Sequence, residues 1–349
     1  MQTHFEDAVT RPLDANTLFA LFPALSIPSP AGAEANPVWA PTINDNDTLT
    51  RAIRPPVEAT KSTRANLEDS EQARIDCKAA FLDEQARAEF AAERYNEARA
   101  FTERAMAIRR GHYGESDPLL SDSFCALGVL SLRLDRVDEA TWHFEQAIEI
   151  LDHRGRGADL EMASLYNNLG ASARRRGDLL SAQAHYESAL SIKIDLLGWQ
   201  HQSVALTLTN LGRLAEQLGD VQAAAHHFAH ARQIAECTEG AVGPALAASL
   251  LGIGRVLLRR GDDVGARFAF ERALQIREAI RCSPRQLASA RFLLAIALEQ
   301  CAPDEARDLV VLAIQDYRSA NTLHPKNLEA MCTWLTLHDA QATYPRSGH

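Results

Sequence analysis

Apolar and polar residues follow a helical period through most of the chain, from about residue 66 to residue 338. Leucine, alanine and aromatic residues recur at spacings of three and four, which gathers them on one helix face and leaves charged residues on the other. Strand signals are absent from these repeats. The first 63 residues differ, because eight prolines recur there without such a pattern. The pattern therefore predicts an all-α protein behind a largely irregular N-terminal tail of residues 1–65.

The helical part repeats itself every 42 residues. A Leu-Gly or Ile-Gly pair stands at four successive positions, and an alanine follows each glycine after twelve residues. An aromatic residue lies four positions beyond that alanine, and a second alanine three positions further. The columns are Gly128, Gly170, Gly212 and Gly254; Ala140, Ala182, Ala224 and Ala266; Phe144, Tyr186, Phe228 and Phe270; and Ala147, Ala189, Ala231 and Ala273. Such a period indicates an array of helix pairs that must stack on their neighbours.

Small residues in these columns predict close packing of the first helix of each repeat, helix A, against the second, helix B. The glycine lets the two helices approach, and the aromatic residue is expected to fill the space between repeats. Three Gly-Asp turns, at Gly177-Asp178, Gly219-Asp220 and Gly261-Asp262, fall where helix A should end and helix B begin. Glycine suits the left-handed residue after a helix, and aspartate suits the N-cap of the next one.

The alanine columns extend beyond the four central units. Ala98 and Ala105 mark a degenerate first repeat, and Ala306 and Ala313 mark a shortened sixth. Pro325 opens a final helix that we expect to cover the end of the stack, within residues 324–349. The predicted array spans 66–323, with repeats at about 72–118, 119–160, 161–202, 203–244, 245–286 and 287–323.

The order of Leu-Gly, Ala-x-x-x-Phe/Tyr and a second alanine resembles the tetratricopeptide repeat, whose usual period is about 34 residues. Segments such as Tyr166–Gly170 and Leu196–Gly198 leading into His201 resemble the longer repeats of kinesin light chains and their bacterial relatives. The resemblance covers about residues 72–321. It implies a right-handed α-α superhelical solenoid of about six helix pairs with a C-terminal capping helix, and a scaffold that binds proteins. It implies no motor complex, since no heptad coiled coil precedes the repeats.

Charge and cysteine usage narrow the class of partner and the compartment. A formal net charge of −10 argues against a nucleic-acid binder or a binder of anionic membranes, because both need a dominant basic face. The six cysteines show no CxxC spacing, which favours reduced thiols in a cytoplasmic protein. No signal peptide and no apolar run long enough to span a bilayer is evident.

The resemblance places helix A on the concave surface, where arginines and asparagines recur in register. The candidate peptide-binding residues are Asn168, Asn210, Arg133, Arg175, Arg213, Arg255 and Arg259. Guanidinium forks and amides suit carboxylates and peptide backbone, so we predict a peptide partner with acidic residues or a free C-terminal carboxylate. A second interpretation stays open, in which the arginines neutralise the carbonyl ends of their helices and solvate the surface.

The sequence gives little support for metal binding or catalysis. His143, His185 and His227 recur at the repeat spacing, but repeats stack about 10 Å apart and zinc needs nitrogens within about 2.1 Å. His226 and His230 could chelate as an i, i+4 pair, yet no third ligand accompanies them. No Ser-His-Asp group, phosphate-binding glycine loop or HExxH motif occurs. We therefore predict no metal, no cofactor and no catalytic activity.

The tail offers a separate hypothesis. A short helix is predicted from Ala15 to Phe22, and Leu21-Phe22-Pro23 resembles the element by which kinesin light chains occupy their own groove. The acidic residues that should follow are missing, so coincidence remains an alternative to an intramolecular contact. The leading function is a cytoplasmic, non-catalytic adaptor. The alternative is a regulatory sensor or effector subunit whose repeats bind a signalling peptide or small molecule and control a partner enzyme.

Overall fold

The structure, a computed structural model, describes residues 65–115, 119–153, 159–319 and 325–343. All secondary structure in these ranges is helical. The described helices form two compact units that divide between Trp199 and Gln200, close to the predicted border of the third and fourth repeats. The helix predicted at Ala15–Phe22 and the hypothesis of a tail contact lie outside the described residues.

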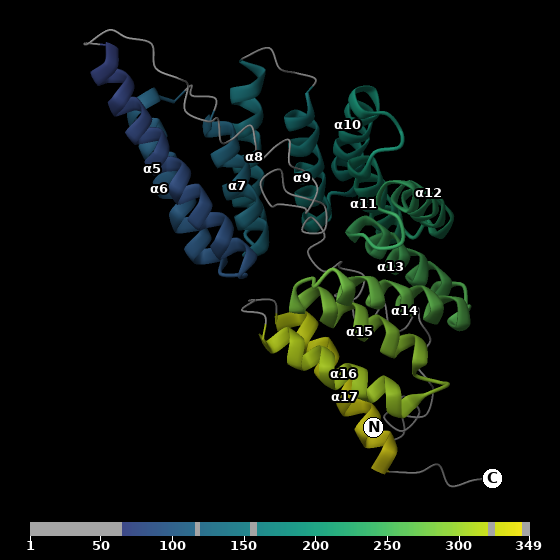
Figure 1. Cartoon of the computed structure of the whole chain (residues 1–349). Coiled ribbons are helices and arrows are strands. Elements are labelled where there is room, and N and C mark those ends of the chain that lie inside the picture. Colours follow the sequence, from purple (N-terminus) through teal and green to yellow (C-terminus); the bar gives the residue numbers. More distant parts are fainter. Residues whose placement is uncertain (1–64, 116–118, 154–158, 320–324, 344–349) are drawn as a thin grey trace, which may run out of the picture. The chain divides into compact units, whose positions relative to one another are not determined.

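The first unit contains three helix pairs, and the second contains three pairs and a final helix (Figure 1). The first unit comprises α5 (Ala65–Ala91) with α6 (Tyr95–Tyr113), α7 (Leu119–Arg133) with α8 (Val137–Asp152), and α9 (Leu160–Arg176) with α10 (Leu179–Leu197). The second comprises α11 (Gln202–Leu218) with α12 (Val221–Glu239), α13 (Pro244–Arg259) with α14 (Asp263–Ala279), α15 (Pro284–Leu298) with α16 (Pro303–Ser319), and α17 (Pro325–Thr343). The predicted helix pairs and the last helix, which packs on α16, are confirmed.

The turns within repeats form as the Gly-Asp pairs predict. Gly177 and Gly219 adopt the left-handed conformation, with φ of 83° and 79°. The side chain of Asp178 accepts a hydrogen bond from the Ser181 amide at 3.1 Å and so caps α10. In the first two repeats the left-handed position is held by non-glycine residues, Glu93 and Asp135. The turn geometry is therefore shared by repeats whose turn sequences differ.

The residues that recur in register from repeat to repeat pack directly against one another. The ring of helix B lies on the glycine of helix A in its own repeat, so that a Cβ on Gly170 would come 2.7 Å from Tyr186. Phe228 also lies against Gly252 of the next helix A. The aromatic residue is therefore not only a filler between repeats, as expected, because it also packs against the glycine of its own repeat. The two alanines of helix B are fully buried in every central repeat.

Exchanging Gly212 for alanine is expected to lower the free energy of unfolding by up to about 2 kcal/mol. The added Cβ would lie 2.7 Å from the buried Phe228 ring. Overpacking of about 1–3 kcal/mol outweighs the gain of about 1 kcal/mol in helix propensity. Urea unfolding followed by circular dichroism measures the difference. Gly111→Ala in α6 is the matched control, because its Cβ would meet no atom within 4 Å and should only stabilise. A stabilised Gly212→Ala would contradict the ring packing.

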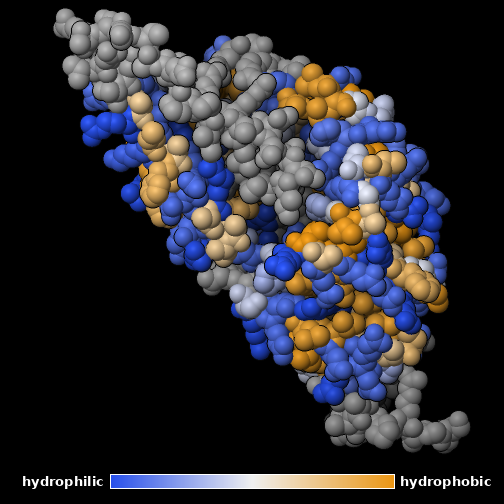
Figure 2. Space-filling view, viewed as in Figure 1, coloured by the Kyte–Doolittle hydropathy of each residue, from blue (hydrophilic) through white to orange (hydrophobic). Residues whose placement is uncertain are grey.

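The outer surface is not uniformly polar. In the view of Figure 2 apolar residues gather over the unit of α11 to α17, while α5 and α6 look mostly hydrophilic. Helix α14 contributes Val264 and Phe268, which are 67% and 64% exposed. Isolated exposed apolar residues are common on soluble proteins, so these two do not by themselves define a site.

Candidate functional site

The predicted peptide-binding residues form two groups, one in each unit. Arg133 belongs to α7, and Asn168 and Arg175 belong to α9. In the second unit Asn210 and Arg213 lie on α11, and Arg255 and Arg259 lie on α13. Helices A of neighbouring repeats touch directly, α7 with α9 and α11 with α13. Side chains on one helix A can therefore reach the helix A before it.

Two of the arginines make the same contact in the two units. Arg175 donates through Nη1 to the carbonyl oxygen of Leu132, and Arg259 donates through Nη1 to the carbonyl oxygen of Glu216 at 3.0 Å. Both contacts span 43 residues and end in the last turn of the preceding helix A. Each carbonyl also accepts a backbone hydrogen bond from the turn after its helix, that of Leu132 from Asp135 and that of Glu216 from Gly219. The arginine adds a second, charged donor, which is favourable at the C-terminal end of the helix dipole.

Arg133 occupies the same register one repeat earlier and also reaches back. Its guanidinium carbon lies 5.1 Å from the ring centre of Phe90 and 5.9 Å from that of Tyr95. The two rings meet edge to face, with centres 5.4 Å apart. This arrangement is a cation-π contact with the turn between the two helices of the first repeat. All three arginines five residues beyond the glycine thus contact the end of the preceding helix A. Arg175 and Arg259 bind a carbonyl there, as the second interpretation expects, but on the preceding helix rather than on their own.

Arg255 is engaged by an acidic residue that the sequence interpretation missed. Its Nε lies 3.1 Å from Oε1 of Glu216 and its Nη2 lies 2.8 Å from Oε2, and both side chains are buried. Glu216 therefore binds Arg255 through its carboxylate and Arg259 through its carbonyl. The pair is 39 residues apart, one helical turn short of the period. An acid and a base at that spacing on helices A is the signal that would have identified Glu216.

The asparagines and Arg213 are buried as well. Asn168 is 1% exposed, its Nδ2 lies 3.9 Å from the sulfur of Cys125, and its Oδ1 makes no hydrogen bond with the described residues. Asn210 and Arg213 are also buried on α11. An enclosed amide oxygen without a donor is unfavourable, so Asn168 has unused capacity to accept a hydrogen bond from a ligand.

The recurring histidines do not form a metal site. His226 and His230 have ring centres 6.3 Å apart, and the part of the chain that the structure describes contains no group of three metal-ligating side chains. Burial lowers the pKa of His143 below its ordinary value; Glu139, 3.6 Å away, opposes this, while Arg99 adds to it. Burial also lowers the pKa of His185. Both histidines are best explained by packing.

Lowering the pH from about 7.5 to about 5.5 should destabilise the protein less in His143→Gln than in the parent. Below the unfolded-chain pKa of about 6.5 the unfolded state takes up a proton that buried His143 resists. Unfolding therefore becomes more favourable as the pH falls toward the lowered pKa of the folded state. Urea midpoints at the two pH values measure the effect. His153→Gln on the same helix is the matched control, since that side chain is 80% exposed. Equal pH sensitivity of parent and His143→Gln would contradict the assignment.

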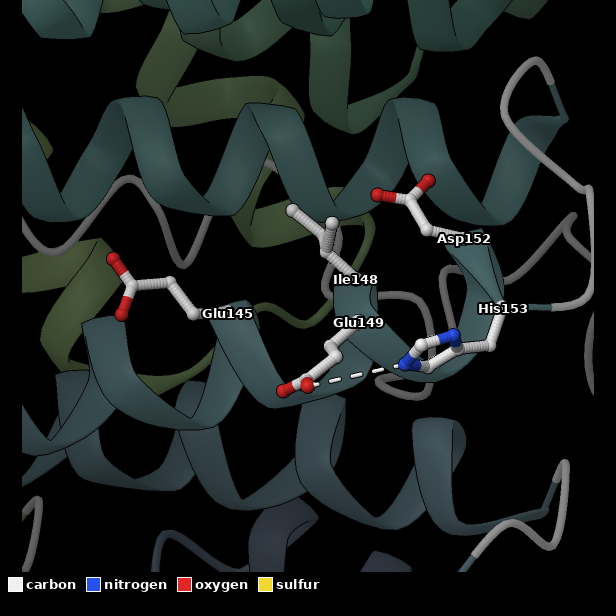
Figure 3. A pocket seen from close by; sticks show the side chains of 5 residues that line it. All are labelled: Glu145, Ile148, Glu149, Asp152 and His153. Atoms are coloured by element: carbon white, nitrogen blue, oxygen red, sulfur yellow. Dashed lines mark ion pairs between the residues drawn. The ribbon is translucent and has the colours of Figure 1, made fainter.

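A hollow of about 470 Å³ lies at the C-terminal half of α8 (Figure 3). Its lining residues are Glu145, Ile148, Glu149, Asp152 and His153. Figure 3 shows Glu149 turned toward His153, at 3.9 Å, while Glu145 points away from both. The described lining residues all come from α8 and its C-cap residue. Three of them are acidic, whereas the predicted groove is basic. The hollow is therefore separate from the helix A residues.

Comparisons with known proteins agree with the helix pairs. The tetratricopeptide repeat model matches residues 78–153 and 161–236. A search of curated proteins finds no match. None of the described helices is long and apolar enough to cross a membrane.

Three solved structures illustrate the likeness. The Rap conjugation gene regulator of the plasmid pLS20, in complex with the Phr* peptide, has a TM-score of 0.60 at 17% identity and covers 83% of both chains. A Rap protein complexed with competence and sporulation factor has a TM-score of 0.56 at 14% identity and covers 77% of both. TPR-like repeats assigned to a kinesin light chain of Podosopora anserina give 0.47 at 21% identity, over 58% of this chain and 95% of that one. With its repeat columns, paired helices and matching family model, the chain contains tetratricopeptide repeats over residues 78–153 and 161–236.

Proposed function

We propose that the protein is a non-catalytic scaffold that binds a peptide segment of a partner along its helices A. Solenoids of stacked helix pairs use extended surfaces of this kind for binding. The observation that carries the proposal is the row of buried polar side chains at matching positions of consecutive helices A. Asn168 and Asn210 lie two residues before the repeat glycine, and Arg213 directly follows it. Asparagine and arginine are mostly exposed in folded proteins, so their burial in register is unusual for a helix that only packs.

Four of the predicted residues hold neighbouring repeats together. Arg175, Arg255 and Arg259 are hydrogen-bonded to the neighbouring repeat, and Arg133 lies on two of its rings. We assign Asn168, Asn210 and Arg213 to ligand contact on the chemistry of their side chains, the amides to peptide backbone and Arg213 to a carboxylate. An acidic partner segment or a free C-terminus fits this chemistry, and a cytoplasmic location belongs to the same proposal.

The peptide complexes of the Rap proteins favour a second candidate of a related kind. Both complexes share the fold with this chain at TM-scores above 0.5; the first contains the Phr* peptide and the second contains competence and sporulation factor. The second candidate is a regulatory subunit whose repeats bind a signalling peptide and control a partner enzyme. A thermal-shift screen of peptides against metabolites tests ligand class, because a ligand of the folded state raises the melting temperature.

The decisive test is affinity purification of partners from the source cell with matched variants. Asn168→Ala, Asn210→Ala and Arg213→Gln should each reduce partner recovery while circular dichroism remains that of the parent. Arg255 is avoided, since its loss would leave Glu216 buried without a counter-ion. Arg232→Gln on α12 is the control, because it removes an exposed arginine from a helix B. Unchanged recovery in all three helix A variants would refute the proposed surface.

A further inference from the structure

The first turn of α15 contains a buried cation without a counter-ion. Arg285 is 3% exposed, and its Nε and Nη1 are enclosed and make no hydrogen bond. Among the residues that the structure describes, Arg285 has no ion pair either. Two other buried arginines are ion-paired, Arg255 with Glu216 and Arg109 with Asp83. Arg285 has no such pair within the described part of the chain.

The surroundings of Arg285 are positively polarised. Pro284 is the first helical residue, so the amide of Arg285 is the first N–H of the turn, at the end where the helix dipole is positive. Side chains point back toward the start of their helix, which carries a long side chain at this position beyond the first turn. Arg277 of α14, also buried, donates to the carbonyl oxygen of Gln286 and brings a second guanidinium to the same turn.

Carboxylates on the adjoining helices are committed elsewhere. Glu278 of α14 and Asp316 of α16 both pair with Arg291, one turn and a half further along α15. A guanidinium cannot lose its proton to escape burial, and an enclosed charge without a partner is strongly unfavourable. Ser283 already caps the start of α15 in a capping box with Gln286, so the donors left for an oxyanion are those of the Arg285 fork, with the positive charge of Arg277 beside it.

We infer that the first turn of α15 binds an oxyanion, a carboxylate or a phosphate, with Arg285 as its principal ligand. This site goes beyond the peptide surface of the proposed function. Arg285 precedes Phe292 by seven residues and so shares the helix face that Phe292 buries in the core. The oxyanion would therefore reach Arg285 from the N-terminal end of α15, not along the peptide surface that contains Asn210 and Arg213 of α11. A bound oxyanion would supply the counter-ion that Arg285 does not find among the described residues.

The test is the melting temperature of the full chain in chloride buffer titrated with inorganic phosphate or with acetate at constant ionic strength. The parent should gain about 2–4 °C or more with at least one of the two anions. Arg285→Met, which keeps the length and removes the charge, should lose this gain. Arg281→Met is the matched control, because it removes an exposed arginine four residues earlier and should keep it. A larger gain with phosphate identifies a phosphate site, and a larger gain with acetate a carboxylate site.

Two results would overturn the inference. One is a parent melting temperature that neither anion changes, and the other is an equal gain in Arg285→Met. Should Arg285→Met fail to fold, Arg285→Lys decides, since it keeps the charge but loses the planar fork and should respond less than the parent. Partner recovery by the Asn168 and Arg213 variants is a separate readout, so the two proposals can fail independently.

Discussion

Replacing Glu216 alone by leucine is expected to lower the free energy of unfolding by about 3–5 kcal/mol. The substitution leaves the Arg255 guanidinium buried beside an apolar side chain, without the three hydrogen bonds that it makes with the carboxylate. The cost comes mainly from this uncompensated charge. Urea unfolding monitored by circular dichroism measures the change.

The double variant Glu216→Leu with Arg255→Met is the control for this result. Replacing both members of a buried ion pair by apolar residues is often neutral or stabilising, so the double variant should recover most of the lost stability. The contact between Arg259 and the carbonyl of Glu216 survives in it, because it involves only the backbone of that residue. A single variant that costs less than about 1 kcal/mol would show that the pair is open to solvent.

Phe270→Ala should cost about 3–5 kcal/mol, the second of the two largest effects. The ring is fully buried and rests on Gly254 of its own repeat, where a Cβ could not fit. Removing the Phe270 ring leaves a cavity, and Gly254 on the facing helix has no side chain to fill it. Urea unfolding of the variant measures the loss.

Phe268→Ala on the same helix is the matched control. Its ring is 64% exposed two residues before Phe270, so its loss should change stability by no more than about 0.5 kcal/mol. Similar costs at the two positions would contradict the assignment of Phe270 to the repeat core.

The fold was predictable because its determinants are local and recur in register. Gly212 packs against the aromatic ring of Phe228, sixteen positions later, and Asp220 caps the helix that begins at the next residue. Both interactions lie within one repeat, so a short stretch of sequence is enough to predict them. Helix ends were less predictable. The last helix runs to Thr343 rather than to about His338, because no proline or glycine ends it earlier.

The sequence predicts which helices carry the candidate residues but not the contacts of those residues. Arginines recur on successive helices A, yet their periodicity does not say which acceptor each guanidinium reaches. Arg259 is bound to a backbone carbonyl, which has no signature in the side-chain pattern. Arg255 is bound to Glu216, whose role depends on the stagger between two helices. The role of Asn168 in binding stays a prediction.

The contacts of Arg175 and Arg259 give the array a direction. Each reaches from a later repeat to a carbonyl in the last turn of the helix A before it, and that carbonyl also accepts a hydrogen bond from its own turn. During synthesis from the N-terminus, these two helices A gain the second, charged donor only after the next repeat has left the ribosome. Removing the repeat that carries Arg175 or Arg259 should therefore loosen the last turn of the helix A before it.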